Sequence, residues 1–492
     1  MNIPMPPDPA FPSLQDLLPR EGAPAFVARM VQETTGVPVQ AEQGDLRCFD
    51  YRPGKHCKLL WSFPSAIGPV HVSGILCMDG EGGRLLAKPA FQQLAQRAAR
   101  LAGGTGPWFA YSPERQLLLQ AFPLDYELPG LVGAGTDSWL REAFAGVLGA
   151  PADAVRILQA RFLSYKPARR CLFQYEVEGP RSRARFFAKV LRGQRAEQLF
   201  ARLKHLRQRL RSEGVPWDMP AAIAYFGDAQ MLVLEALDGV IEAEEVETRA
   251  ITDPDARHTL RGLIALAAQG LPLFQRAIVP GLELVTTQGV LDDCAKDTCF
   301  LPGLRCVAPG VARALTALLR RLEDEALRLP PEPIGLGHGS FRHTHFLLRG
   351  ERPIVVDLDG LCLCGQSVDA GKFLACLDRS ALRRYEARSV LKECEEVFLE
   401  ELRRLPSFSS SWVTWHRTAT LIKWALRSFS SLSSRWLEVT EALVQQSEQL
   451  LTALAHTRTT LGGAGQGTAS TAANAASVPV QRWRGLPRVH RD

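Results

Sequence analysis

The N-terminal half of the chain repeats itself at one constant spacing. Residues 47–57 (Arg-Cys-Phe-Asp-Tyr-Arg-Pro-Gly-Lys-His-Cys) align with residues 161–171 (Arg-Phe-Leu-Ser-Tyr-Lys-Pro-Ala-Arg-Arg-Cys), 114 positions later. The same spacing, without a gap, aligns 116–119 (Gln-Leu-Leu-Leu) with 230–233 (Gln-Met-Leu-Val). A shared spacing over about 70 residues rarely arises by chance, so the sequence predicts two copies of one folded module.

The residue pattern of the second copy predicts an antiparallel sheet with one long helix. Alternating apolar residues predict a hairpin from 157–165 and 171–177, a third strand at 184–191 and a closing strand at 231–237. Residues 194–211 have a helical period instead, because four leucines fall on one face: Leu199, Leu203, Leu206 and Leu210. We expect the first copy to contain the same elements in the same order.

Composition indicates an ordinary globular protein. With 492 residues, 46% hydrophobic content and a net charge of +6, the chain is long enough for several cores and only mildly basic. That charge makes nucleic acid an unlikely partner. The chain has no basic, apolar leader at its start and no long apolar run, so we expect a cytoplasmic protein without membrane contact. The cysteines Cys294, Cys299 and Cys306 lack the paired spacing of usual zinc sites.

The pattern divides the chain into five parts. Beyond the repeat the sequence is mainly helical, with an irregular connector at 280–309. The C-terminal part is rich in Gly, Ala, Ser and Thr, which is typical of disorder. The expected parts are an extended Pro-rich lead-in at 1–25, the first copy at 26–136, the second copy at 137–239, a helical part at 240–457 and a disordered tail at 458–492.

The helical part contains a short stretch of strands and polar turns. Residues 336–348 (Leu-Gly-His-Gly-Ser-Phe-Arg-His-Thr-His-Phe-Leu-Leu) and 353–360 (Pro-Ile-Val-Val-Asp-Leu-Asp-Gly) predict a hairpin. Asp357 and Asp359 come directly after its last apolar strand. Because an unpaired carboxylate is costly to bury, such residues usually lie near solvent or bind a cation, and their oxygens suit magnesium.

This stretch resembles the catalytic and metal loops of the aminoglycoside phosphotransferase and choline kinase family. That family has His-Gly-Asp-x-His-x-x-Asn (or Gln), then Ile-Asp-Phe-Asp, then Gly-Asp-Pro-x-x-Asp-Leu. Here 338–339 match the first motif, 357–359 match the second, and 365–369 (Gly-Gln-Ser-Val-Asp) stands for the third. This sequence differs from the family at the positions that carry out the chemistry. Ser340 replaces the catalytic aspartate, Arg342 replaces the following histidine, and His345 replaces the metal-binding amide.

The resemblance implies an α+β, protein-kinase-like two-lobe fold. It would have an antiparallel β small lobe and a mainly helical large lobe, preceded by a second, degenerate small-lobe copy. The resemblance also implies ATP and Mg²⁺ as cofactors. It places Ser340, His345 and Asp359 at catalytic positions, and Asp357 with His345 at the metal.

Residues of the second copy resemble the nucleotide side of a kinase small lobe. Lys189, in the strand Phe-Phe-Ala-Lys-Val, stands where a lysine contacts phosphates. The basic turn with Lys166 and Arg169 stands in place of a Gly-rich loop, and the segment with Glu235 and Leu237 in place of the hinge strand that meets adenine. The first copy has an isoleucine where the second has Lys189, which suggests a structural role or a protein-binding role.

Two functions remain open at this level. The first is ATP-dependent phosphoryl transfer to a hydroxyl of a small molecule, impaired because a serine at position 340 cannot act as the base at neutral pH. The second is a pseudokinase, which binds a nucleotide or serves as a scaffold without transfer. The stretch from Trp415 to Trp436, which includes Trp424, has aromatic residues at helical spacing; core packing is favoured there over a substrate shelf.

Overall fold

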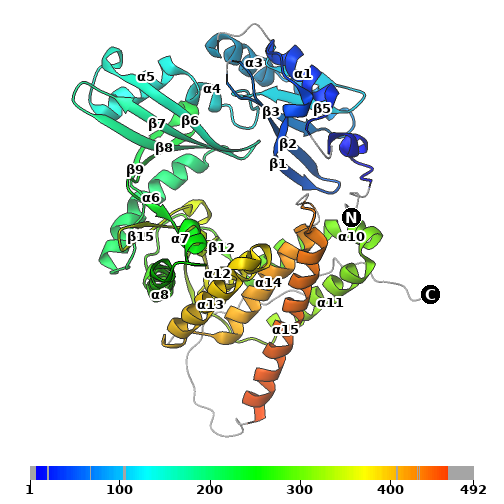
Figure 1. Cartoon of the computed structure of the whole chain (residues 1–492), viewed down its shortest axis with the longest axis vertical. Helices are drawn as coiled ribbons and strands as arrows, with labels where there is room; N and C mark the ends of the chain where they lie inside the picture. Colours follow the sequence, from blue (N-terminus) through cyan, green and yellow to red (C-terminus); the bar gives the residue numbers. More distant parts are fainter. Residues whose placement is uncertain are drawn as a thin grey trace. The chain divides into compact units, whose positions relative to one another are not determined.

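The computed structural model describes residues 7–18, 22–66, 68–102, 107–405, 408–428, 430 and 433–463. The chain divides into two compact units. The sheet unit comprises Pro4–Lys204 and Pro220–Leu237, and the helical unit comprises His205–Met219 and the described part of Asp238–Asp492. In Figure 1 the sheet unit runs from blue to green and the helical unit from green to orange-red.

The sheet unit contains two five-stranded antiparallel sheets with the same strand order. The first sheet has the order β1-β2-β3-β5-β4 and the second β6-β7-β8-β10-β9. The strands of the first are β1 Asp45–Arg52, β2 His56–Phe63, β3 Val70–Leu76, β4 Phe109–Ser112 and β5 Leu117–Ala121; those of the second are β6 Arg156–Lys166, β7 Arg170–Glu178, β8 Arg183–Leu191, β9 Ala222–Phe226 and β10 Met231–Glu235. The α+β class and the antiparallel sheets are therefore as expected.

The registers of the two sheets agree at the spacing of the sequence repeat. Cys57 lies opposite Leu76 in the first sheet, and Cys171 lies opposite Val190 in the second, so both partners are shifted by 114 positions. Ile75 lies opposite Leu118, just as Lys189 lies opposite Leu232. A one-residue slip would reverse every side chain, so this agreement indicates equivalent sheets.

The N-terminal lead-in differs from the extended segment that we expected. Pro12–Leu17 forms a 3₁₀ helix, and Asp8 before it caps the β1–β2 turn by accepting from the Tyr51 hydroxyl (2.8 Å) and the Gly54 amide (2.9 Å). Asp125 does the same for the β6–β7 turn, accepting from Tyr165 (2.6 Å) and Ala168 (2.8 Å). Asp8 and Asp125 are 117 positions apart rather than 114, so an alignment at the constant spacing of 114 does not pair them.

Helices cover the sheets and complete their cores. The helices of the sheet unit are α1 Ala25–Thr35, α2 Glu81–Leu86, α3 Pro89–Ala102, α4 Leu131–Ala134, α5 Asp137–Leu148 and the first part of α6 Arg195–Ser212. On one face of the second sheet, Phe144 of α5 stacks on Phe186 of β8 with ring centres 5.2 Å apart. Ala188 and Val190 belong to the same buried cluster. Because strand side chains alternate, Lys189 lies on the opposite face.

The helical unit packs long helices around two small sheets. Its helices are α7 Ala243–Arg249, α8 Pro254–Arg276, α9 Thr287–Lys296, α10 Leu301–Val307, α11 Pro309–Ala326, α12 Val368–Arg383, α13 Arg388–Arg403, α14 Ser410–Ser428 and α15 Trp436–Gly463. Its strands are β11 Ile241–Glu242, β12 Leu284–Val285, β13 Ile334–Gly337, β14 Phe346–Arg349, β15 Arg352–Val355 and β16 Cys362–Gly365. The sheets have the orders β11-β14-β15 and β12-β16-β13. They position the loops that the motifs occupy.

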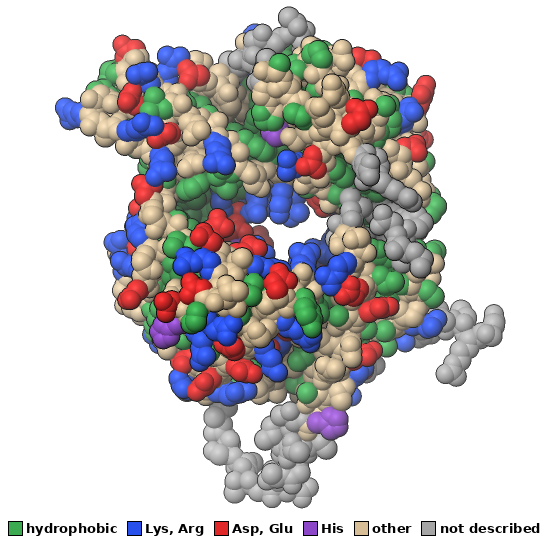
Figure 2. Space-filling model, viewed as in Figure 1, with side chains coloured by type: hydrophobic (Ala, Val, Ile, Leu, Met, Phe, Trp, Pro, Cys, Tyr) green, Lys and Arg blue, Asp and Glu red, His purple; other side chains and the backbone are tan. Residues whose placement is uncertain are grey.

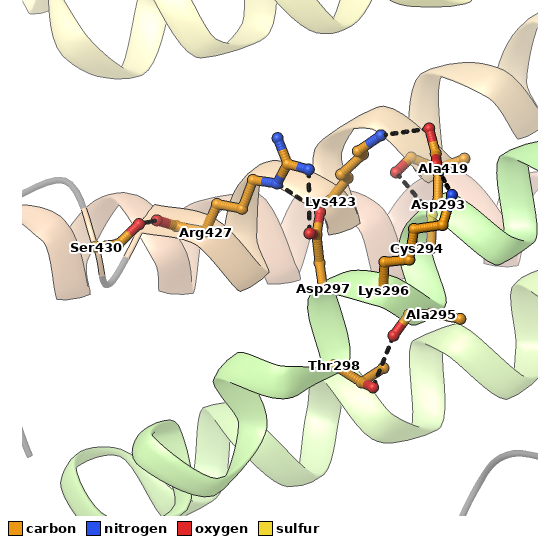
Figure 3. A network of polar contacts seen from close by, with 10 residues as sticks. All are labelled: Asp293, Cys294, Ala295, Lys296, Asp297, Thr298, Ala419, Lys423, Arg427 and Ser430. Atoms are coloured by element: carbon orange, nitrogen blue, oxygen red, sulfur yellow. Dashed lines mark hydrogen bonds and ion pairs between the residues drawn. The ribbon is translucent and has the colours of Figure 1, made fainter. Parts of the chain in front are cut away.

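The expected irregular connector at 280–309 is instead largely helical, because α9 and α10 lie within it. Ion pairs attach this segment to α14 (Figure 3). The fully buried carboxylate of Asp297 accepts from Nε and Nη2 of Arg427 at 2.5 and 3.0 Å. Asp293 pairs with Lys423 at 3.0 Å. Short helices without a long apolar period gave no clear sequence signal, and long-range ion pairs hold them in place.

Three further expectations concern the ends and the surface. The start of the disordered tail, predicted at residue 458, is too early, because α15 continues to Gly463. Residues 464–492 lie outside the described part. No helix in the described residues is long and apolar enough to cross a membrane. Figure 2 shows basic and acidic side chains interspersed over the visible face of the helical unit, as the mild net charge suggests.

Candidate functional site

The loop after β13 is fixed by a buried carboxylate. Asp369, in the first turn of α12, accepts from the backbone amides of His338 (2.6 Å) and Gly339 (3.1 Å). Lys372, one turn further along α12, donates to the Gly339 carbonyl at 2.7 Å. Asp369 is the acidic residue of the third motif, so its role is to hold the loop that carries Ser340.

Two glycines allow this loop to pack against the loop after β15. Gly339 has a φ of +78°, and a Cβ there would lie 2.2 Å from the Gly360 carbonyl oxygen. Side-chain and backbone bonds also join the loops. The Val356 amide donates to the His345 carbonyl (2.9 Å), and Nε2 of His338 lies 3.1 Å from the Val356 carbonyl. The two motifs are therefore one structural feature, as the predicted hairpin implied.

The hydrogen bonds assign the tautomer of His338. A carbonyl only accepts, so Nε2 of His338 carries the proton that goes to Val356. Nδ1 is then an acceptor, and the Ser340 hydroxyl donates to it at 3.3 Å. Burial lowers the pKa of His338, which keeps the ring neutral. The structure thus pairs the serine at the catalytic position with a histidine that takes up a proton poorly.

His345 and Asp357 come together, as the sequence predicted. Nε2 of His345 lies 3.5 Å from Oδ2 of Asp357. The same nitrogen accepts from Nε of Arg342 at 2.5 Å. A neutral imidazole nitrogen has one lone pair, and here it is directed at a guanidinium rather than toward a metal.

The metal loop offers two carboxylates, which is the number that magnesium at a nucleotide usually takes from the protein. In the described residues, no group of three or more His, Cys, Asp or Glu side chains could hold a metal ion. Asp357 supplies carboxylate oxygen from a left-handed backbone position (φ 60°), and Asp359 follows in a half-buried 3₁₀ turn. Magnesium prefers oxygen ligands, so the two aspartates fit it better than His345 does.

His343, the remaining histidine of the loop, lies in the interior. Its Nε2 lies 3.0 Å from Glu247 Oε2, and both side chains are 1% exposed. Glu247 also pairs with Arg384 at 3.2 Å. This buried network connects α7 to the loop and to the end of α12, so His343 supports the structure rather than reaching an acceptor.

Sequence reasoning missed an aromatic support behind the loop. Trp217 packs against Phe341 and Phe346 with ring centres 5.9 and 5.5 Å apart. Gly270 of α8 leaves room for its ring, because a Cβ there would lie 2.1 Å from it. The backbone of Asp218 then bonds to β15. Since this segment precedes the loop by more than a hundred residues, no local pattern could have indicated the contact.

The residues predicted to face phosphates belong to the sheet unit. Lys189 is half-buried in β8, and Lys166 is exposed at the β6–β7 turn. Arg169 of the same turn lies 3.7 Å from Asp50 of the first sheet, although its side chain is 62% exposed. Ala168 has a φ of 60° where the first copy has a glycine. The turn is thus held by Asp125 and has no glycine-rich backbone for phosphates.

The residues predicted to meet adenine end strand β10. The backbone amide of Glu235 donates to the Ala221 carbonyl (2.9 Å), and its side chain accepts from the Ala221 amide (3.1 Å). Leu237 follows in an irregular segment and is half-buried. Glu235 thereby fixes the entry to β9, and its amide is already used within the protein.

Comparisons with known proteins give structural likenesses only. The sequence matches no protein-family model, and no curated protein matches it significantly. Similar solved structures include a choline/ethanolamine kinase family protein from Mesorhizobium loti (14% identity, 64% of this chain, 99% of that chain, TM-score 0.40) and a choline kinase from Streptococcus pneumoniae (14%, 64%, 98%, 0.39). A spectinomycin phosphotransferase in complex with ADP and spectinomycin is another (12%, 65%, 98%, 0.43). Likenesses of this size assign no activity.

Proposed function

We propose that this chain is a phosphotransferase of the aminoglycoside phosphotransferase and choline kinase type, with ATP as donor and a small-molecule hydroxyl as acceptor. The observation that carries the proposal is the joined pair of loops, which Asp369 holds at His338 and Gly339 and which Asp357 ends. In the sheet unit, Lys189 would contact the nucleotide phosphates, together with Lys166 and Arg169 of the β6–β7 turn. The segment of Glu235 and Leu237 would meet adenine.

In this reaction the acceptor oxygen bonds to the γ-phosphorus while the bond to the β–γ bridging oxygen breaks and ADP leaves. The acceptor proton must pass to a base. Ser340 cannot serve, burial lowers the pKa of His338 behind it and so makes it a weaker base, and His345 already accepts from Arg342. The half-buried Asp359 is the remaining candidate. A positioned base contributes about 10²–10⁴-fold, so we expect slow transfer.

The alternative is a pseudokinase, and one observation favours it. The guanidinium of Arg342 donates to His345, where the family has an amide for metal. The guanidinium of Arg342 thus takes up the nitrogen lone pair of His345 that a metal ion would need. A protein that binds a nucleotide through its phosphates without transferring one would tolerate this arrangement.

Nucleotide binding tests both readings. Thermal shift and calorimetry of the full chain with ATP, in excess Mg²⁺ and in EDTA, should show stabilisation that Asp357→Ala weakens. Glu351→Ala, an exposed acid at the other end of the same hairpin, should leave it unchanged. If millimolar ATP gives no shift under either condition, neither a phosphotransferase nor a nucleotide-binding pseudokinase remains tenable.

Restoring the family residue separates the two functions. Ser340→Asp and the unmodified protein are compared for ATP consumption with a panel of hydroxyl acceptors. A gain of about 10²-fold or more in the variant alone would mark a decayed transferase. Fast turnover by the unmodified protein that Asp357→Ala does not affect would refute the assignment of these loops.

A further inference from the structure

Helices α12, α14 and α15 enclose a small pocket with basic and aromatic walls. Its volume is about 130 Å³, and its lining includes Arg379, Arg383, Trp424, Ser428, Arg435 and Trp436. None of the described residues that line it is acidic. A cavity of about 150 Å³ in another protein holds benzene, so there is room here for a ring or a compact anion. In the stretch from Trp415 to Trp436, Trp424 and Trp436 thus border a cavity, while Trp415 is in the core.

Two of the positive charges in this pocket have no paired carboxylate among the described residues. Arg435 pairs with Glu438 at 2.6 Å, but in the described part of the chain no carboxylate pairs with Arg379 or Arg383. Arg379 lies over the ring of Trp424, 4.8 Å from its centre. The neighbouring charged residues of α12 are paired, because Asp378 binds Arg417 and the residue after the helix, Arg384, binds Glu247. Arg379 and Arg383 therefore differ from these paired neighbours and from Arg435.

Holding these arginines together is unfavourable in the unliganded protein. They are four residues apart on α12, where like charges repel. Burial, and then the charge of Arg383, lower the pKa of Arg379 to about 10; Arg342 acts in the same direction. A partly buried cation without a counter-ion loses hydration, which the ring of Trp424 replaces only in part. An anion in the pocket would supply that counter-charge.

The pocket is linked to the candidate site along one face of α12. Lys372, Arg379 and Arg383 follow one another at spacings of seven and four residues, which keep to one side of a helix. Lys372 donates to the carbonyl of Gly339, next to Ser340. At 1.5 Å per residue, Arg379 lies about 10 Å further along the axis. A molecule of modest size could reach from Arg379 to the loop.

We propose that this pocket binds the anionic group, carboxylate or phosphate, of a hydroxylated small molecule, so that the acceptor of the proposed reaction is an anion. The guanidinium of Arg379 would donate to the anion, Arg383 would add charge, and Trp424 and Trp436 would contact an apolar or ring portion. The acceptor role rests on the proposed function, whereas the anion site itself does not.

The test measures binding without nucleotide. Calorimetry and thermal shift of the full chain use benzoate and phenyl phosphate as the two anionic probes, with benzamide as the neutral match and sodium chloride at equal ionic strength. We expect benzoate or phenyl phosphate to bind, benzamide not to bind, and Arg379→Gln to weaken binding at least about tenfold. The difference between the two anions identifies the preferred group.

Controls keep the result interpretable. Arg383→Gln, a second position in the pocket, should weaken binding less and guards against misfolding of the Arg379 variant. Arg404→Gln removes an arginine that pairs with Glu400 on the surface, and it should have no effect. Equal stabilisation by benzamide, or binding that neither pocket variant alters, would overturn the proposal. Because ATP is absent, either outcome is independent of whether the protein binds a nucleotide.

Discussion

Gly339 is the residue at which the motif and the backbone constrain each other most. Its positive φ and its approach to the Gly360 carbonyl leave no room for a side chain. A Cβ would force the two loops apart or break the amide bonds to Asp369. The glycine of the His-Gly pair thus has a structural reason here that is independent of catalysis.

We therefore expect Gly339→Ala to lower the free energy of unfolding by about 2–4 kcal/mol. Gly262→Ala is the matched control, because a Cβ on this exposed glycine of α8 would meet no heavy atom within 4 Å and the backbone there is helical. It should stabilise by about 0.5–1 kcal/mol. Urea denaturation measures both. Equal effects of the two variants would contradict the close loop contact.

At the level of elements, the attachment of α9 and the turn after it to α14 depends on two ion pairs of different burial. The carboxylate of Asp297 is fully buried and is bound twice by Arg427, whereas the side chain of Asp293 is 49% exposed. Solvent screening weakens an exposed pair, so the two should differ in energy although both join the same segments.

Asp297→Asn should cost about 2 kcal/mol and Asp293→Asn at most about 1 kcal/mol at pH 7. Burial raises the pKa of Asp293, but its bonds to Lys296 and Lys423 outweigh this and hold it below its usual value. A carboxyl group whose pKa is lowered on folding stabilises the folded state at pH values above its unfolded pKa, which is near 4. That stabilisation is lost as the pH falls. Denaturation at pH 7 and pH 3 should show the Asp293→Asn difference shrinking at pH 3; a difference that persisted in full there would not be electrostatic.

At the scale of the whole molecule, the sheet unit consists of two modules that each begin with a capping aspartate. Asp8 and Asp125 accept the same kinds of bond, from a tyrosine hydroxyl and from a turn amide. This equivalence extends the repeat upstream of the aligned motif. It also gives the lead-in a definite task in the first module.

Asp8→Ala and Asp125→Ala should each leave a hydroxyl and an amide without an acceptor. We expect a loss of about 2–4 kcal/mol for Asp125, which is 1% exposed, and a smaller loss for Asp8, which is 8% exposed. Thermal denaturation checks this, with Glu114→Ala as a control on an exposed acid. An Asp8→Ala variant as stable as the unmodified protein would mean that the first module folds without its lead-in.

The sequence by itself determined the features that arise from local pattern. A constant spacing of 114 specified two sheets of equal register, because strand period and turn position are encoded locally. The motif order also predicted that His345 and Asp357 would meet, since a hairpin joins them directly.

Only the tertiary structure decided which groups each side chain meets. It directed Arg342 at the lone pair of His345, placed Trp217 behind the loop, and gathered Arg379 and Arg383 into a pocket whose described lining has no carboxylate. These contacts depend on packing between segments far apart in the chain, and no periodicity reports them. The same holds for Asp8, whose partner turn lies more than forty residues away.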